Sequence, residues 1–229
     1  MKIQLRLVVA VLISFATINF GNIHAQNCIY QCDPSLKERK LFHEEFKDLG
    51  VQYIYELEYA TPECKMPPIN ETFLSIEERK NLQKYAEAIK KKEEGIAWHL
   101  QYIDETVGFG IFADQFINTG DYIAEYIGLV LSKDEIFKRM PYDVAYTWTI
   151  KPPKYYDQQA FYLVDSKKTG NFTRFVNHSY EPNVVALIIY MEDAWHMIYV
   201  AMKDIRKGEQ LLVDYGKGYW ASCDPKELH

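Results

Sequence analysis

The feature that most constrains the fold is a succession of short apolar segments that begins after Gly95. The segments are rich in β-branched and aromatic residues, and Gly, Asn, Asp or Pro separates each from the next, a pattern typical of short β-strands joined by turns. Examples are "DYIAEYIGLVLS", "VVALIIY" and "EQLLVDYG". The pattern predicts a mainly β domain, of the β-rich α+β class, over residues 96–220, followed by a short C-terminal tail at residues 221–229.

The sequence before this domain has a different pattern. In "SIEERKNLQKYAEAIKKKEEG", Ser75 and Glu78 have the spacing of a capping box, apolar residues follow at helical spacing, and Gly95 is suited to end the helix. The charged segment from Asp33 predicts an earlier helix, and "VQYIYELEY" predicts a short strand. We therefore expect a helical N-terminal region over residues 27–95, with scaffolding as its default role.

The first residues, 1–26, match the pattern of a secretory signal peptide. Lys2 and Arg6 precede the apolar run "LVVAVLISF", and small and polar residues ending in "IHAQ" follow. The run is too short for a comfortable membrane span. The pattern predicts a secreted or periplasmic protein, of bacterial type, with delivery into a host cell as one route; a buried N-terminal helix or strand is the alternative.

Net charge narrows the choice of partners. The formal charge is -6, and removal of a signal peptide that carries Lys2, Arg6 and no acidic residue changes it to -8. An acidic chain is a poor candidate for general nucleic-acid binding, because neutralising phosphates requires clustered Lys and Arg. It is better suited to attracting a basic partner such as a lysine-rich peptide. The hydrophobic fraction of 48% supports a real core.

The chain has four cysteines, and their spacing does not reveal their role. They are Cys28, Cys32, Cys64 and Cys223. In an exported chain they can pair as disulfides in three ways, and spacing alone does not choose one. No pair has the CxxC spacing of a structural zinc site, so we predict no bound metal.

Two motifs lie early in the strand-rich domain. In "VGFGIFA", Gly108 and Gly110 flank Phe109, and glycines let a backbone approach a ligand closely or turn at positive φ. Taken alone, the pair is more simply explained by a β-turn. A dinucleotide-binding loop is excluded, because no third glycine and helix follow. In "AEYIG", Tyr126 follows a turn, and an amphipathic strand is the simpler explanation of that segment taken alone.

A denser motif is "RFVNHSYEPN". Asn177 and His178 carry amide and imidazole groups that can read an adenine-like edge. Local hydrogen bonds from side chain to backbone are one alternative. N-glycosylation is another, since Asn70, Asn171 and Asn177 each begin an Asn-x-Ser/Thr sequon. A last motif, "DIRKGEQLLVDYGKGYW", is a turn leading into a strand that ends at Tyr215.

In this order and spacing, "RFVNHS.EPN" followed by "GEQLLVDYG" resembles the SET-domain family of protein lysine methyltransferases, over residues 98–220. The resemblance implies a SET-domain fold of small β-sheets with a C-terminal pseudoknot, in which the last segment passes under a preceding loop. That crossing would bring Asn177 and His178 beside Tyr215.

The resemblance also implies roles for individual residues. Tyr215 matches the catalytic tyrosine, and Tyr126 matches an aromatic residue near the methyl-transfer channel. Relatives that carry Phe or Tyr at the position of Val213 are limited in the number of methyl groups they add. The smaller side chain of Val213 leaves room for di- or trimethylation unless another aromatic residue fills the space, so the resemblance leaves the number of methyl groups open. The positions that match S-adenosylmethionine-binding residues are Gly108, Phe109, Gly110, Arg174, Asn177, His178 and Trp220, and those that match the substrate channel are Tyr146, Tyr162 and Val213.

The chemistry of such a site explains these residue types. A lysine amine attacks a methyl group only when neutral, and from a pKa of about 10.4 its deprotonation at pH 7 costs about 4.6 kcal/mol. Burial among aromatic side chains disfavours the ammonium and lowers that cost. A narrow channel also aligns the amine with the methyl group. The resemblance therefore predicts an S-adenosylmethionine-dependent lysine methyltransferase that acts on a basic protein such as a histone.

The match departs from the family at one informative position. Many members have Cys where this chain has Tyr180, with a Cys-x-Cys cluster further on that completes a zinc site, whereas only Cys223 stands in this tail. The resemblance thus implies no zinc. A SET fold that has lost catalysis and binds a peptide is the main alternative function. A hydrolase using Ser179 is a weaker one, because no Gly-x-Ser-x-Gly motif is present.

Overall fold

The computed structural model describes residues 30–32, 46–157, 159–191 and 194–222, with backbone only for residues 30–32 and 220–222. The predicted signal peptide at residues 1–26 lies outside the described residues, as do Cys28, Cys223 and the end of the tail. Among the described residues, no helix has the length and apolar character needed to cross a membrane.

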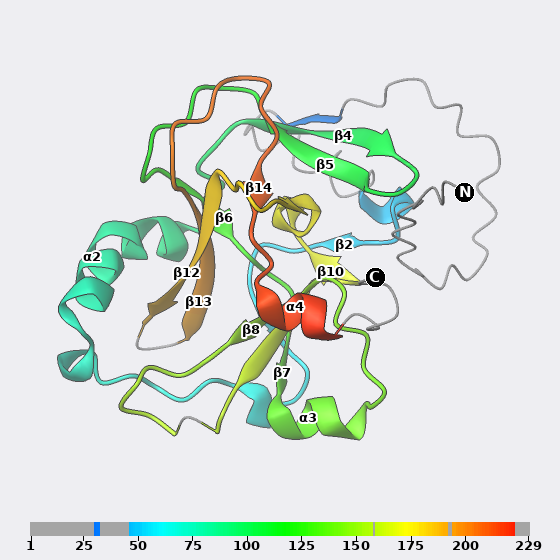
Figure 1. Cartoon of the computed structure of the whole chain (residues 1–229). Coiled ribbons are helices and arrows are strands. Elements are labelled where there is room, and N and C mark those ends of the chain that lie inside the picture. The colour runs from blue at the N-terminus through cyan, green and yellow to red at the C-terminus, as the bar shows by residue number, and fades with distance from the viewer. Residues whose placement is uncertain (1–29, 33–45, 158, 192–193, 223–229) are drawn as a thin grey trace, which may run out of the picture.

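The described residues form more strand than helix, and the strands are arranged in small β-sheets (Figure 1), which confirms the predicted strand-rich class. One sheet has the order β1 (Tyr30–Cys32), β4 (Trp98–Asp104), β5 (Gly108–Ala113), and a second pairs β10 (Thr169–Gly170) with β2 (Gln52–Tyr53). The largest has the order β11 (Asn177–His178), β14 (Leu212–Val213), β12 (Val184–Tyr190), β13 (Trp195–Ala201), β6 (Tyr122–Glu125). The fourth has the order β3 (Glu58–Tyr59), β7 (Leu129–Ser132), β9 (Tyr162–Asp165), β8 (Thr147–Ile150).

The longest helix, α2 (Ile76–Lys91), begins with the predicted capping box. Ser75 N donates to Glu78 Oε2 at 2.7 Å, and Glu78 N donates to Ser75 Oγ at 3.2 Å. The helix ends at Lys92, which takes the left-handed conformation with φ 54°, and so stops before the predicted terminator Gly95. Gly95 has another role, because a Cβ at that position would lie 2.2 Å from the Tyr122 carbonyl oxygen.

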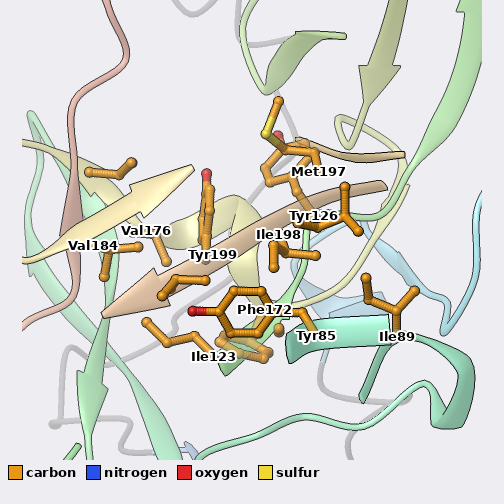
Figure 2. Packing of buried hydrophobic residues seen from close by; sticks show 14 of the residues in the cluster. Tyr85, Ile89, Ile123, Tyr126, Phe172, Val176, Val184, Met197, Ile198 and Tyr199 are labelled. Carbon is orange, nitrogen blue, oxygen red and sulfur yellow. The ribbon is translucent and has the colours of Figure 1, made fainter. Parts of the chain in front are cut away.

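Most of the shorter helices lie between strands, and the last of them follows the last strand. They are the 3₁₀ helices η1 (Pro62–Cys64), η2 (Glu71–Phe73) and η3 (Phe172–Phe175), and the α-helices α3 (Lys133–Lys138) and α4 (Lys217–Ser222). Figure 2 shows that Tyr85 and Ile89 of α2 belong to the same buried cluster as Tyr126 and Tyr199. The helix therefore packs its apolar face on the main core of the strand-rich domain.

The predicted helix from Asp33 lies largely outside the described residues, and the described part of the N-terminal region contributes strands to sheets of the following domain. The run "VQYIYELEY" is not one strand: it divides into β2, which pairs in parallel with β10, and β3, which pairs in parallel with β7. Phe46 also packs against Trp98 of β4, at a ring distance of 6.5 Å. These short strands complete sheets of the following domain, since a sheet edge with unpaired backbone groups gains hydrogen bonds from them.

Two distant segments lie side by side at β11 and β14, which pair in parallel with Asn177 opposite Leu212 and His178 opposite Val213. Asn183 fixes the segment that leads into β14. Its Nδ2 donates to the Gln210 carbonyl at 2.8 Å, and its Oδ1 accepts from Leu212 N at 2.8 Å. The chain that leaves β14 therefore continues directly past residues 176–178.

Candidate active site

The Gly108 to Gly110 segment forms the start of β5, and Asn177 is tied to it. The Asn177 Nδ2 donates to the Phe109 carbonyl at 3.0 Å. A Cβ at Gly110 would lie 2.5 Å from Gln210 Nε2 and 3.1 Å from Asn177 Nδ2, so the ends of these two side chains would have to shift to make room for it. Gly108 has φ +74° and open space around the position of a Cβ, which leaves its backbone accessible to a ligand.

His178 contacts the catalytic candidate directly. Its Nδ1 accepts a hydrogen bond from Tyr215 N at 3.2 Å, and Asp214 Oδ1 lies 3.7 Å from the same nitrogen. The imidazole ring also contacts the ring of Tyr180, at 4.6 Å and 90°, while Tyr180 itself is 83% exposed. The structure thus brings Asn177 and His178 beside Tyr215, as the expected chain crossing predicted.

The Tyr215 side chain is fixed by a hydrogen bond from its hydroxyl and by contacts of its ring with other aromatic rings. The hydroxyl donates to the Val176 carbonyl at 3.1 Å. The ring lies 6.4 Å from that of Trp148, at 88°, and 4.9 Å from that of Tyr219, at 63°. Burial raises the pKa of Tyr215 well above its usual range. The group is therefore neutral at physiological pH, and its oxygen remains able to accept a hydrogen bond from an amine.

Tyr126 also packs against Trp148. Its hydroxyl donates to the Tyr146 carbonyl at 2.7 Å, and only 3% of the residue is exposed. The Tyr126 ring lies 6.4 Å from the ring of Trp148 and 5.8 Å from that of Tyr199. Burial raises the pKa of Tyr126 as well. Four side chains thus form one contiguous group, which we call the aromatic enclosure: Tyr126, Trp148, Tyr199 and Tyr215.

Sequence reasoning missed two members of the aromatic enclosure. Trp148 of β8 and Tyr199 of β13 lie in segments that the sequence identified only as strands. In the structure Trp148 Nε1 donates to the Tyr199 hydroxyl at 2.7 Å. The available signal was the presence of an aromatic residue with a polar tip in each of two apolar strands, since such residues need a hydrogen-bond partner when buried.

Arg174 has contacts that its predicted cofactor-binding role did not anticipate. Its Nε donates to the Ser166 carbonyl at 2.7 Å and its Nη2 to the Lys167 carbonyl at 3.3 Å. The guanidinium carbon lies 4.1 Å from the centre of the Tyr146 ring and 4.5 Å from that of Phe175. These contacts direct the guanidinium toward the loop of Tyr146, and a direct contact with the cofactor stays a prediction.

The remaining predicted site residues are placed differently. Val213 is buried in β14, opposite His178. Tyr162 lies in another aromatic group, with its ring 5.4 Å from that of Trp195, so its predicted place in the channel is not supported by a contact with the aromatic enclosure. Trp220 is in α4, but its side chain lies outside the described residues.

Two alternatives from the sequence can be judged from local contacts. Asn171 is 3% exposed, and its side chain donates to the Glu125 carbonyl and accepts from Thr173 N, so the fold already uses this sequon residue. The Ser179 hydroxyl accepts from Glu181 N at 3.0 Å, which is a turn contact and not the arrangement of a nucleophile with a base. Within the described ranges, no group of three or more His, Cys, Asp or Glu is placed to hold a metal ion.

Residues 108–216 match the family model described as SET domain. The chain is 32% identical over 124 residues to histone-lysine N-methyltransferase EZH2 of Chaetomium thermophilum, a match that covers 50% of this chain and 8% of that relative. It is 30% identical over 158 residues to N-lysine methyltransferase KMT5A-A of Xenopus laevis, covering 68% of this chain and 45% of that relative. The chain therefore spans less than half the length of either relative.

A solved structure has a similar fold over a larger share of the chain. The crystal structure of ATXR5 in complex with histone H3.1 mono-methylated on R26 aligns with a TM-score of 0.57 and 23% sequence identity. The alignment covers 81% of this chain and 91% of that one. At this level of identity the similarity concerns the fold, and it confirms the expected fold of small β-sheets.

Proposed function

Because residues 108–216 form a SET domain, we propose that this chain is an S-adenosylmethionine-dependent protein-lysine N-methyltransferase. The observation that carries the proposal is the position of Tyr215. Its backbone N–H donates to His178, and its ring lies against Trp148. One residue thereby joins the candidate cofactor-binding segment to the aromatic enclosure, where a substrate amine would lie. The two relatives named above are both lysine methyltransferases by name.

The residues near Gly108 fit an adenosyl group. The backbone at Gly108 is accessible, and Asn177 uses its amide N–H on the Phe109 carbonyl, which leaves the amide oxygen to accept from an exocyclic amino group. When bound, S-adenosylmethionine supplies a methyl group activated by its sulfonium, so that the S–C bond breaks as the N–C bond to the amine forms.

The aromatic enclosure has the properties that the amine needs. Its low polarity disfavours an ammonium ion, and its walls restrict the directions in which an amine can point. The Tyr215 oxygen can accept an N–H of the amine, because its own hydrogen is directed to Val176. The raised pKa values of Tyr126 and Tyr215 make these phenols unsuitable as bases. The amine therefore releases its proton to water before it attacks.

The substrate we propose is a lysine in a basic protein such as a histone. The formal charge of -6 favours association with a cationic partner, and histone-lysine relatives are consistent with it. The small side chain of Val213 supports addition of more than one methyl group.

We further propose that residues 1–26 direct export from a bacterial cell, and that the exported protein acts in a host cell where histones are available. The support is the charged, apolar and small-residue pattern that begins at Lys2. The test is the N-terminal residue of the protein recovered from culture fluid. A mature chain that begins near Gln26 supports export, and an intact Met1 in cytosolic protein contradicts it.

The enzymatic proposal is tested with labelled S-adenosylmethionine and core histones. Wild-type protein is compared with Tyr215→Phe and Asn177→Ala. Label on histone lysine that depends on both residues supports the assignment. Binding of cofactor or peptide with no transfer over a wide panel of basic proteins would instead identify a SET-fold binding module.

A further inference from the structure

Arg174 is a buried cation next to the aromatic enclosure. Only 8% of the residue is exposed, and none of the ion pairs found among the described residues includes it. Its Nε and Nη2 donate to two backbone carbonyls, which are neutral. A buried charge without an oppositely charged partner at contact distance is costly to a fold, so its presence suggests a function beyond packing.

The guanidinium reaches the aromatic enclosure through Tyr146. It stacks on the Tyr146 ring at 4.1 Å, and the Tyr146 carbonyl accepts hydrogen bonds from Tyr126 Oη at 2.7 Å and from Ser166 N at 2.9 Å. Tyr146 holds this position with φ +62°, a left-handed conformation that non-glycine residues rarely adopt. Tyr146 therefore links the two groups, since its ring contacts the guanidinium of Arg174 and its carbonyl accepts from the hydroxyl of Tyr126.

Other charged and titratable groups near Arg174 do not cancel its charge at contact distance. Asp165 of β9 is the acidic group that acts on it, but its Oδ2 accepts from the Tyr142 hydroxyl and its Oδ1 from Lys167 N. The Lys167 ammonium pairs with Asp143. The remaining groups that face the guanidinium are the phenols of Tyr146, Tyr126 and Tyr215, which are neutral as long as they are protonated.

We propose that the buried charge of Arg174 favours the neutral, reactive form of a lysine amine in the aromatic enclosure over its ammonium form. The inference rests on the proposed methyltransferase function and concerns how that function is achieved. A positive charge within several ångströms, in a site of low polarity, repels an incoming ammonium much more than it does in water. Its influence extends to both walls of the site, because it lowers the pKa of Tyr126 and of Tyr215 against the larger raising effect of burial.

Arg174 is accordingly a positioning residue with an electrostatic role, since it touches neither amine nor methyl group. Its loss should move the pH dependence of methyl transfer. The single-turnover rate rises with pH as the bound amine loses its proton. In Arg174→Met the midpoint of that rise should move up by about one pH unit, with a rate about tenfold lower on the acid side. Arg174→Lys, which retains the charge, should keep the midpoint close to that of the wild type.

A chemical rescue separates this role from a structural one. The labelled histone lysine is replaced by a cysteine that is then aminoethylated, which gives an isostere with a more acidic amine because sulfur replaces a methylene. This substrate should restore the acid-side rate of Arg174→Met toward the wild-type value. Affinity for S-adenosylhomocysteine and the thermal unfolding midpoint are measured on every variant.

If Arg174→Met does not fold, Tyr146→Glu and Tyr146→Gln give the same information. They are matched in size, and only the Glu variant places a carboxylate against the guanidinium. Its midpoint should be the higher of the two. Equal midpoints in this pair, or in wild type and a folded Arg174→Met, overturn the inference. Absence of methyl transfer by the wild type would overturn the proposed function itself.

Discussion

The indole Nε1 of Trp148 donates a hydrogen bond to the hydroxyl oxygen of Tyr199 at 2.7 Å. The two residues belong to different sheets, since Trp148 is in β8 and Tyr199 is in β13. A single hydrogen bond therefore fixes the distance between two walls of the aromatic enclosure. Because the indole N–H and the hydroxyl oxygen already bond to each other, the spacing of these two walls does not depend on a bound substrate.

This contact predicts a measurable coupling between Trp148 and Tyr199. Tyr199→Phe keeps the ring but leaves the indole N–H without its acceptor, so the free energy of unfolding should fall by about 1–2 kcal/mol. Combined with Trp148→Phe in a double-mutant cycle, the loss should be clearly less than additive, as judged by urea unfolding. Tyr102→Phe, on the exposed face of β4, is the control and should change stability little. Additive losses would show that the bond does not stabilise the fold.

A second prediction concerns Gly110. In Gly110→Ala the new Cβ meets Gln210 Nε2 and crowds Asn177 Nδ2, so Asn177 should lose its bond to Phe109. We expect affinity for S-adenosylhomocysteine to fall about tenfold, with a stability loss of about 1–3 kcal/mol from overpacking. Isothermal titration calorimetry and urea unfolding measure the two effects. Gly218→Ala is the matched control, since no atom lies within 4 Å of its added Cβ. Unchanged affinity in Gly110→Ala would argue against a cofactor site here.

A third prediction separates binding from chemistry at Tyr215. Tyr215→Phe retains the ring between Trp148 and Tyr219 but removes the oxygen that would accept an amine N–H. The single-turnover rate of methyl transfer should fall about a hundredfold, comparable to the loss of one oriented group in other active sites. Affinity for S-adenosylhomocysteine should stay close to that of the wild type. Tyr180→Phe, which keeps the ring against His178, should retain full activity.

The buried phenols predict how stability depends on pH. Burial raises the pKa of Tyr126, Tyr199 and Tyr215 in the folded state. The unfolded chain then loses these protons first, at about pH 10, so stability is fully present below that pH and decreases above it. Urea unfolding from pH 7 to pH 11 should show a plateau and then a decline. Tyr199→Phe should decline less steeply, and an equal slope would mean that Tyr199 does not contribute to the effect.

The sequence could predict the parts of the site that lie within continuous motifs. Asn177, His178 and Tyr215 are recognisable because each lies within a continuous motif, "RFVNHS.EPN" or "GEQLLVDYG", that can be identified in the sequence alone. In the structure they meet because β11 and β14 pair in parallel. The helix at Ser75 was equally predictable, since a capping box is a local feature.

The parts that could not be predicted depend on how separate segments meet. Trp148 becomes a partner of Tyr199 only when β8 and β13 approach each other, and the polar tip of each residue indicates that it needs a partner without indicating which one. Tyr162 shows the converse, because an aromatic residue in a plausible strand turned out to pack on Trp195. At Arg174 the motif identified the residue, but its contacts are set by the loop at residues 166–167.

The pairing of β2 with β10 and of β3 with β7 makes the folding unit longer than the segment that family similarity recognises. A chain that began at residue 96 would lack both partner strands, and Phe46 and Tyr53 would be missing from the core. A chimaera in which the SET region is replaced by that of a relative should therefore fold only when the preceding segment, Phe46 to Gly95, is transferred together with it. The shared sheet edges therefore tie the stability of the two regions together, so a substitution in β2 or β3 should weaken the region that holds β7 and β10 as well.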